Sequence, residues 1–192
     1  MKKILPLLFL MIFSTVSAQS TNGEDSKYAA GTVPVDEYGR IAFQETIKAD
    51  ELTATEIGNK VSDWFNNRFK KPVVIAAKRY ESESPNKLEA KVEEYIVFKN
   101  KFFVLDRSRI DYILTITSED GVCNFNMSRI TYLYDEENPE GALQMKAEDW
   151  ITDKEAINSK KGTLKKFPGK FRRKTIDLKD TLIQELKNEL TK

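Results

Sequence analysis

The stretch that decides the fold is "RSRIDYILTITSEDGVCNFNMSRITYLY", residues 107–134. In its first half apolar and polar side chains alternate. The apolar set is Ile110, Tyr112, Leu114 and Ile116, and the polar set is Arg109, Asp111, Thr115 and Thr117. The "EDG" at 119–121 predicts a tight turn into a second strand, so the stretch is expected to form a β-hairpin. Such alternation is typical of an antiparallel sheet with one face buried and one face in water.

The second half of the hairpin changes phase. Its apolar residues fall first at odd positions (Cys123, Phe125, Met127) and then at even ones (Ile130, Tyr132, Tyr134). One extra residue on this strand would restore the pattern, because side chains on a strand repeat every second residue. We therefore predict a β-bulge near Ser128.

Further strands and two main helices are expected around the hairpin. Strand-like patterns cover residues 40–47, 72–81 and 87–99. "TATE" at 53–56 is a capping box, and the helix behind it should end at about Arg68, before Pro72. A C-terminal helix is expected from about Asp177, with a short helix around 148–157 before it. The order β-α-β-β-β-β-α predicts a two-layer α+β domain, an antiparallel sheet with its helices on one face.

That order resembles the layout of one half of the TATA-box-binding protein (TBP). The stretches "GTVPVDEYGRIAFQETIKAD" (31–50) and "VSDWFNNRFKKPVV" (61–74) are similar to an exported bacterial domain-of-unknown-function family with a TBP-like fold. The resemblance covers roughly residues 33–125, and residues 147–186 are similar to a tail that often accompanies the domain. It implies the fold but supplies no catalytic residues, and a shared fold does not imply a shared function.

The N-terminus has the three parts of a secretory signal peptide. Lys2 and Lys3 precede the apolar residues 4–13, and Val16-Ser17-Ala18 is a small-residue cleavage site. We expect cleavage after Ala18, a periplasmic or secreted protein, a flexible leader at 19–32 and a single domain at 33–192.

Composition excludes several kinds of function. The chain has no histidine, which removes Ser-His-Asp and Cys-His catalysis and the usual histidine metal sites. Cys123 is the only cysteine and is expected to be a small buried residue, with an intermolecular bridge or a reactive thiol as the alternative. We expect no cofactor and no metal.

The net charge of the chain disfavours a nucleic-acid partner. Removing residues 1–18 takes away two of the 31 basic side chains and none of the 30 acidic ones, which leaves 29 against 30. The solvated positions expected on the sheet are balanced as well: Glu89, Lys91, Glu93, Lys99, Arg109 and Asp111. Proteins that hold DNA usually carry a basic excess, so we predict no nucleic-acid partner.

One segment departs from this balance. Residues 160–174 carry eight Lys or Arg and no acid. Six of these are candidates for contact with an anionic membrane or lipopolysaccharide: Lys165, Lys166, Lys170, Arg172, Arg173 and Lys174. The alternative is a solvated basic loop whose charge is balanced by acidic residues at 135–140 and 148–149.

A ligand pocket between the curved sheet and the C-terminal helix is a further hypothesis. Trp64, Phe98, Tyr112 and Tyr132 could line it, or could simply be core. The sequence favours a non-catalytic binding module for an envelope protein or a small apolar or anionic ligand. Peripheral membrane attachment through residues 160–174 and a carboxylate-dependent hydrolase are the alternatives, although no pair of acidic residues stands out.

Overall fold

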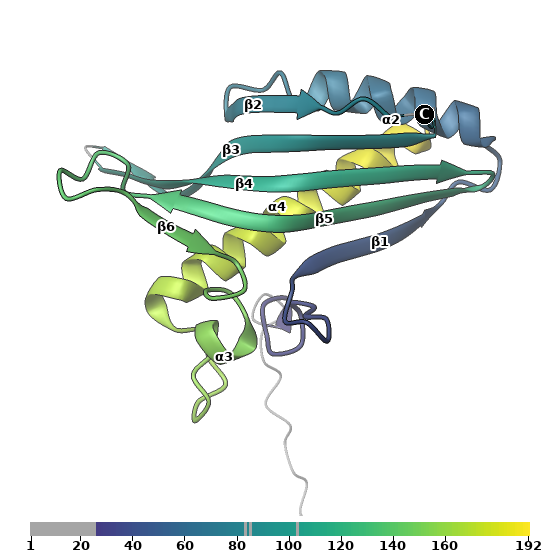
Figure 1. Cartoon of the computed structure of the whole chain (residues 1–192). Coiled ribbons are helices and arrows are strands. Elements are labelled where there is room, and N and C mark those ends of the chain that lie inside the picture. Colours follow the sequence, from purple (N-terminus) through teal and green to yellow (C-terminus); the bar gives the residue numbers. More distant parts are fainter. Residues whose placement is uncertain (1–25, 83, 85, 103) are drawn as a thin grey trace, which may run out of the picture.

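A six-stranded antiparallel sheet with its helices on one side forms the molecule (Figure 1). The computed structural model describes residues 26–192 except 83, 85 and 103. The strands are β1 (Ala42–Lys48), β2 (Val74–Arg79), β3 (Lys87–Lys101), β4 (Val104–Glu119), β5 (Val122–Tyr134) and β6 (Leu143–Lys146). The helices are α2 (Ala54–Arg68), α3 (Asp153–Ala156) and α4 (Lys166–Leu190). This confirms the α+β fold class predicted from the sequence.

Strand order in the sheet is β1-β5-β4-β3-β2, and β6 extends the β1 side by pairing with the C-terminal part of β5. The β4–β5 hairpin turns at Asp120 and Gly121, and Gly121 has the positive φ of 73° that such a turn requires. Strands β3, β4 and β5 are long and define a twisted platform. Helix α4 crosses this platform diagonally in Figure 1, and α2 lies along its β2 side.

The predicted bulge is present in β5. Asp111 pairs with Thr131 and Ile113 pairs with Ser128, so Tyr112 faces two residues of β5, Arg129 and Ile130. Arg129 has φ of 53°. The extra residue returns the apolar side chains of β5 to the helix-covered face, and the core continues past it to Tyr132.

The core lies between the sheet and the two long helices. Helix α2 begins at the predicted capping box, in which Thr53 and Glu56 bond each other's backbone N–H groups. Its buried residues Ile57, Val61 and Trp64 face the sheet. No helix in the described part of the chain is long and apolar enough to cross a membrane.

Helix α4 starts eleven residues earlier than expected, at Lys166 rather than Asp177. Pro168 and Gly169 suggested a loop, but Pro168 lies in the first turn, where a missing N–H costs no helical hydrogen bond. A Cβ on Gly169 would lie 2.9 Å from the Cβ of Leu164, so glycine allows this close approach. The predicted basic loop at 160–174 is therefore wrong beyond Lys165, because residues 166–174 are helical.

Other boundaries also differ from the expectation. Strand β6 was not predicted, and the helix expected around 148–157 is the short α3. The leader is packed rather than flexible in its described part, where Tyr28 is buried and its hydroxyl donates to Asp177 at 2.6 Å. Residues 1–25, which include the predicted signal peptide, lie outside the described residues.

Lys99 does not lie on the solvated face of the sheet, where the sequence predicted it. A bulge in β3 between Val97 and Lys99 places Lys99 opposite Asp106, whose carboxylate bonds Lys170 of α4. The remaining charged positions predicted for the solvated face alternate with buried residues along β3 and β4, as expected.

Candidate functional site

The face of the sheet that the helices leave uncovered is the largest candidate surface. Its side chains are the residues of β3, β4 and β5 that alternate with the core positions, and most are half-buried by their neighbours on the same face. Near the β4–β5 turn a patch of Thr115, Thr117, Asn124 and Asn126 is uncharged, with Lys48, Lys87, Glu89 and Glu119 around it. The opposite end of the face carries Glu93, Arg107, Arg109 and Asp111. The two ends therefore offer different chemistry.

The uncharged patch near the β4–β5 turn holds a shallow pocket of about 350 Å³. Its lining includes Gln44, Thr46, Thr115, Thr117, Asn124 and Asn126, from three adjacent strands. The Thr46 hydroxyl donates to the Asn124 side chain at 2.9 Å, whereas the buried Oδ1 of Asn126 has no hydrogen-bond partner within the described chain. This end can exchange hydrogen bonds with a neutral polar group.

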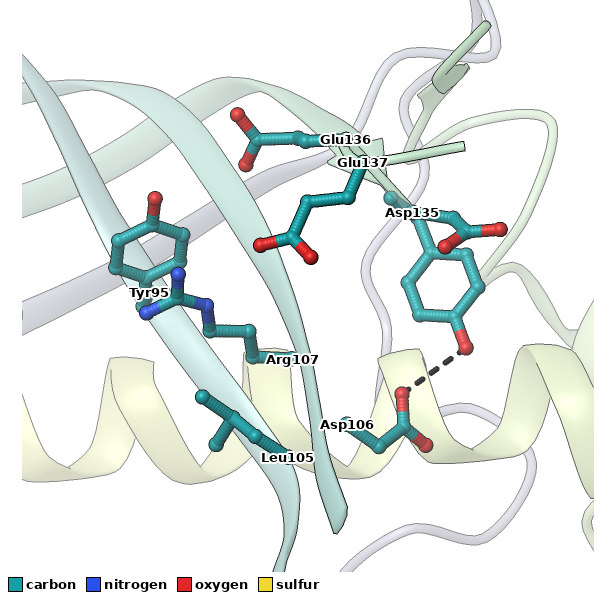
Figure 2. A pocket seen from close by; sticks show the side chains of 8 residues that line it. Tyr95, Leu105, Asp106, Arg107, Asp135, Glu136 and Glu137 are labelled. Carbon is teal, nitrogen blue, oxygen red and sulfur yellow. Dashed lines mark hydrogen bonds between the residues drawn. The ribbon is translucent and has the colours of Figure 1, made fainter. Parts of the chain in front are cut away.

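The charged end holds a pocket of about 510 Å³, drawn in Figure 2. It is lined by Tyr95, Leu105, Asp106, Arg107, Tyr134, Asp135, Glu136 and Glu137. One wall comes from β3 and β4, where the guanidinium of Arg107 lies 3.9 Å from the centre of the Tyr95 ring. The facing wall is the start of the β5–β6 loop and carries three consecutive carboxylates, at Asp135, Glu136 and Glu137. Figure 2 shows the Glu137 carboxylate pointing toward Arg107 and Tyr95.

Lys170 of α4 supports this pocket from behind. Its ammonium bonds both carboxylate oxygens of Asp106 at 2.9 and 3.1 Å and the Tyr134 hydroxyl at 3.1 Å. It also lies 4.3 Å from the ring centres of Phe98 and Tyr134. Asp106 is thereby neutralised, and the carboxylates of the loop supply the net charge of the pocket.

Charges on the strands beside the pocket form a connected set. Glu93 and Asp111 are direct cross-strand neighbours, and Arg109 lies 3.9 Å from Asp111 and 3.8 Å from Glu136. Partial burial, and then repulsion by Glu93, raises the pKa of the Asp111 carboxyl. Neither member of this carboxylate pair lines either pocket, so the pair has no evident place for a substrate.

A buried polar network lies on the covered face. Arg68 donates to Glu94 at 2.8 Å and lies 3.1 Å from Glu185, and the Tyr112 hydroxyl donates to Glu94 at 2.6 Å. The side chains of Arg68 and Glu94 are 5% and 2% exposed. Every charge in it has an opposite partner inside the protein, which is typical of a structural network rather than a ligand site.

The four aromatic residues proposed to line a pocket lie in the core. Trp64, Tyr112 and Tyr132 are buried, and Phe98 packs against Phe171 with ring centres 4.7 Å apart. Phe171 of α4 also contacts Tyr132 and fills the space between the sheet and the helix. None of these four residues lines either of the two pockets described above.

The basic segment is divided by the structure. Lys160, Lys161, Lys165 and Lys166 are exposed near the start of α4. Arg172 is fully buried, Lys170 is held by Asp106, and the guanidinium of Arg173 lies 4.3 Å from the centre of the Tyr28 ring. Lys174 is half-buried. The structure therefore does not present the six candidate cations as one surface.

Two further observations bear on chemistry. Within the described residues no group of three acidic or cysteine side chains is arranged to hold a metal ion. Cys123 is fully buried, and burial raises its thiol pKa to about 12. A thiol in this state is a poor nucleophile.

Sequence reasoning missed the residues of the charged pocket. The acidic residues at 135–140 enter the sequence analysis only as a balance for the basic segment, and nothing local indicates that Asp135 lies near Tyr95 and Arg107, forty and twenty-eight residues earlier. The available signal was the phase of Tyr95 and Arg107, which places both on the solvated face of adjacent strands.

An antiparallel sheet covered by helices on one face and open on the other defines a TBP-like α+β domain. The family model described as a domain of unknown function (DUF4468) with TBP-like fold matches residues 43–133, which confirms the resemblance inferred from the sequence.

Solved structures agree with this match. The chain is similar to a DUF4468 family protein from Bacteroides ovatus, with a TM-score of 0.77, 29% identity and coverage of 86% of this chain and 94% of that one. It is also similar in fold to a TBP-like protein from Parabacteroides distasonis, with a TM-score of 0.67, 20% identity and coverage of 83% and 97%. No curated protein matches the chain.

Proposed function

We propose that this protein is an exported, non-catalytic binding module that holds an envelope protein on the uncovered face of its sheet. One observation carries the proposal: the helices leave one face of a six-stranded sheet open, the pocket of about 350 Å³ lies on that face, and the pocket of about 510 Å³ lies at its charged end, where Tyr95 and Arg107 belong to it. The signal-peptide pattern of residues 1–18 supports export.

A protein partner fits this surface better than a small apolar ligand. Small apolar ligands need an enclosed apolar cavity, and the space between sheet and α4 is filled by Phe171 and its aromatic neighbours. The uncovered face instead offers hydrogen-bonding and charged groups over several strands. Surfaces of this kind are suited to protein contacts, in which polar groups give specificity.

Site-specific photo-crosslinking tests the proposal. A photoreactive side chain placed at Thr117 or Asn124, on the open face, is expected to give an adduct of one reproducible mass in the cells that make the protein. The same side chain at Gln184, exposed on α4, is the matched control and should give none. Equal labelling from both faces, or adducts from Gln184 alone, would refute the proposal.

Peripheral attachment to an anionic surface is the second candidate, since four exposed lysines gather near the start of α4 beside Phe167, which is 38% exposed. Each cation near an anionic membrane contributes about 1 kcal/mol. On this reading K160E/K161E should abolish salt-sensitive sedimentation with phosphatidylglycerol vesicles, whereas K70E/K78E, of equal charge change, should not. Equal losses in both variants would mean that only net charge matters.

A further inference from the structure

We propose that the charged pocket binds a basic segment of the partner protein, with a lysine or arginine side chain in the pocket and an apolar residue against the β3–β4 hairpin. This inference rests on the proposed function and names the chemistry of the partner. Three separate features support it: the charge of one wall, the unpaired arginine on the other, and the apolar hairpin beside both.

The charge of the pocket favours a cation. Asp106 is already neutralised by Lys170, and Glu136 lies 3.8 Å from Arg109, at the limit of an ion pair. Asp135 and Glu137 form no ion pair with any described residue. A lysine or arginine entering here would meet these carboxylates in a partly enclosed site, where charge interactions are screened less than on an open surface.

Arg107 favours a peptide over a simple cation. No described carboxylate lies within ion-pair distance of it, and its guanidinium is stacked on Tyr95. Its N–H groups can therefore donate to the carbonyl oxygens of a bound chain. A site that offers donors on one wall and carboxylates on the other suits a segment that presents both carbonyls and a cationic side chain.

The β3–β4 hairpin adds an apolar contact. Phe102, Leu105 and Val104 are 87%, 56% and 45% exposed, and Leu105 lines the pocket. Exposed apolar side chains next to a charged pocket are typical of an interaction site. An anionic membrane is disfavoured here, since the loop carboxylates would be repelled from it. A partner segment with alternating basic and apolar residues satisfies both features.

The probe for the test is the acetylated and amidated peptide Lys-Leu-Lys-Phe-Lys, and its control has glutamate at the three lysine positions. Binding is measured by calorimetry, and its location by amide chemical shifts. We expect the basic peptide to bind with shifts at Tyr95, Leu105 and Arg107, and the acidic peptide to give no heat. E136Q/E137Q should weaken binding about tenfold, because two charges are removed with little change of shape.

The matched control is E37Q/E51Q, which removes two exposed carboxylates away from the pocket and should leave affinity unchanged. L105S should weaken the same peptide several-fold without changing the salt dependence. Equal binding of both peptides, shifts on α4, or equal effects of the two glutamine pairs would overturn the inference. Salt-sensitive self-association that E136Q/E137Q abolishes would also overturn it, since the occupant would then be a second copy of the chain.

Failure of this inference can be told from failure of the proposed function. If the peptide does not bind but open-face crosslinks at Thr117 and Asn124 appear, only the chemistry of the partner is wrong. If neither peptide binding nor open-face crosslinks appear, the binding function itself fails.

Discussion

Replacing Arg172 by methionine is expected to lower the free energy of unfolding by about 3–5 kcal/mol, the range for removing one member of a buried charge network. The Arg172 side chain is fully buried. Its guanidinium donates to the carbonyl oxygens of Tyr28 at 3.0 Å and Ile151 at 2.8 Å, to the Ala29 carbonyl oxygen, and to the Thr32 hydroxyl at 3.1 Å. It also pairs with Asp153 at 2.8 Å.

The magnitude follows from these acceptors. Methionine keeps much of the apolar volume but donates no hydrogen bond, so three carbonyl oxygens lose a charged donor. Each buried group left without a partner costs about 1–3 kcal/mol, and water entering around Tyr28 recovers part of that total. The Ala29 carbonyl oxygen still accepts from the Thr32 hydroxyl at 2.9 Å, so two carbonyl oxygens are left without a donor. Their summed cost is about 2–6 kcal/mol, and the net loss should lie near the middle of that range.

The assay is urea unfolding followed by circular dichroism, with Arg173→Met as the matched control. Arg173 is the next residue, half-buried and stacked on Tyr28, so its loss should cost less than about 1 kcal/mol. Hydrogen exchange should also speed up at residues 28–32 in R172M, since Arg172 ties this segment to α4. Equal stability losses in the two variants, or unchanged exchange at 28–32, would refute the reasoning.

The remaining predictions concern single buried groups. Y112F should lower the free energy of unfolding in urea by about 2 kcal/mol, because the Tyr112 hydroxyl bonds a carboxylate. Y132F should lower it by about 1 kcal/mol, because the Tyr132 hydroxyl bonds a neutral hydroxyl. A larger loss in Y132F than in Y112F would contradict this. Asp111 has a raised pKa in the folded state, so the folded protein binds more protons and stability falls as pH rises through the window above 3.8. D111N should therefore raise the melting temperature at pH 7, with an advantage that shrinks as pH falls through that window; a pH-independent difference would exclude the pKa effect. Cys123 should react with a thiol reagent only at the rate of unfolding, and rapid labelling of the native protein would show that it is accessible.

The sequence predicted most of the sheet because strand periodicity is a local signal. The β4–β5 hairpin, the bulge and the capping box at Thr53 follow from side-chain spacing within a few residues. In and just before β1, Ile41, Phe43 and Ile47 are apolar at alternate positions and Glu45 interrupts them. The structure explains this exception by an ion pair of 2.8 Å between Glu45 and Lys187. That partner lies 142 residues away, so the exception was visible in the sequence while its reason was not.

The start of α4 and the burial of Arg172 were missed for a related reason. Charge runs with Pro and Gly usually indicate solvated loops, and the acceptors that bury Arg172 come from residues 28–32 and 151–153. The apolar stripe of α4, continued back from Ile176 through Thr175 to Phe171, was the local evidence for a longer helix. The charged pocket likewise needs three segments that only the folded sheet brings together.

The placement of charges along α4 bears on where a partner can bind. Lys170 pairs with Asp106 of β4, Glu185 with Arg68 of α2, and Lys187 with Glu45 of β1, so the helix is fixed to three elements along its length. Apolar packing is not directional, whereas ion pairs fix the register of one surface against another. Sliding α4 to open the core would break these three pairs together, and the pairs with Asp106 and Arg68 are partly shielded from water. The covered side is therefore held closed, which leaves the uncovered side and the pockets described above for the proposed partner.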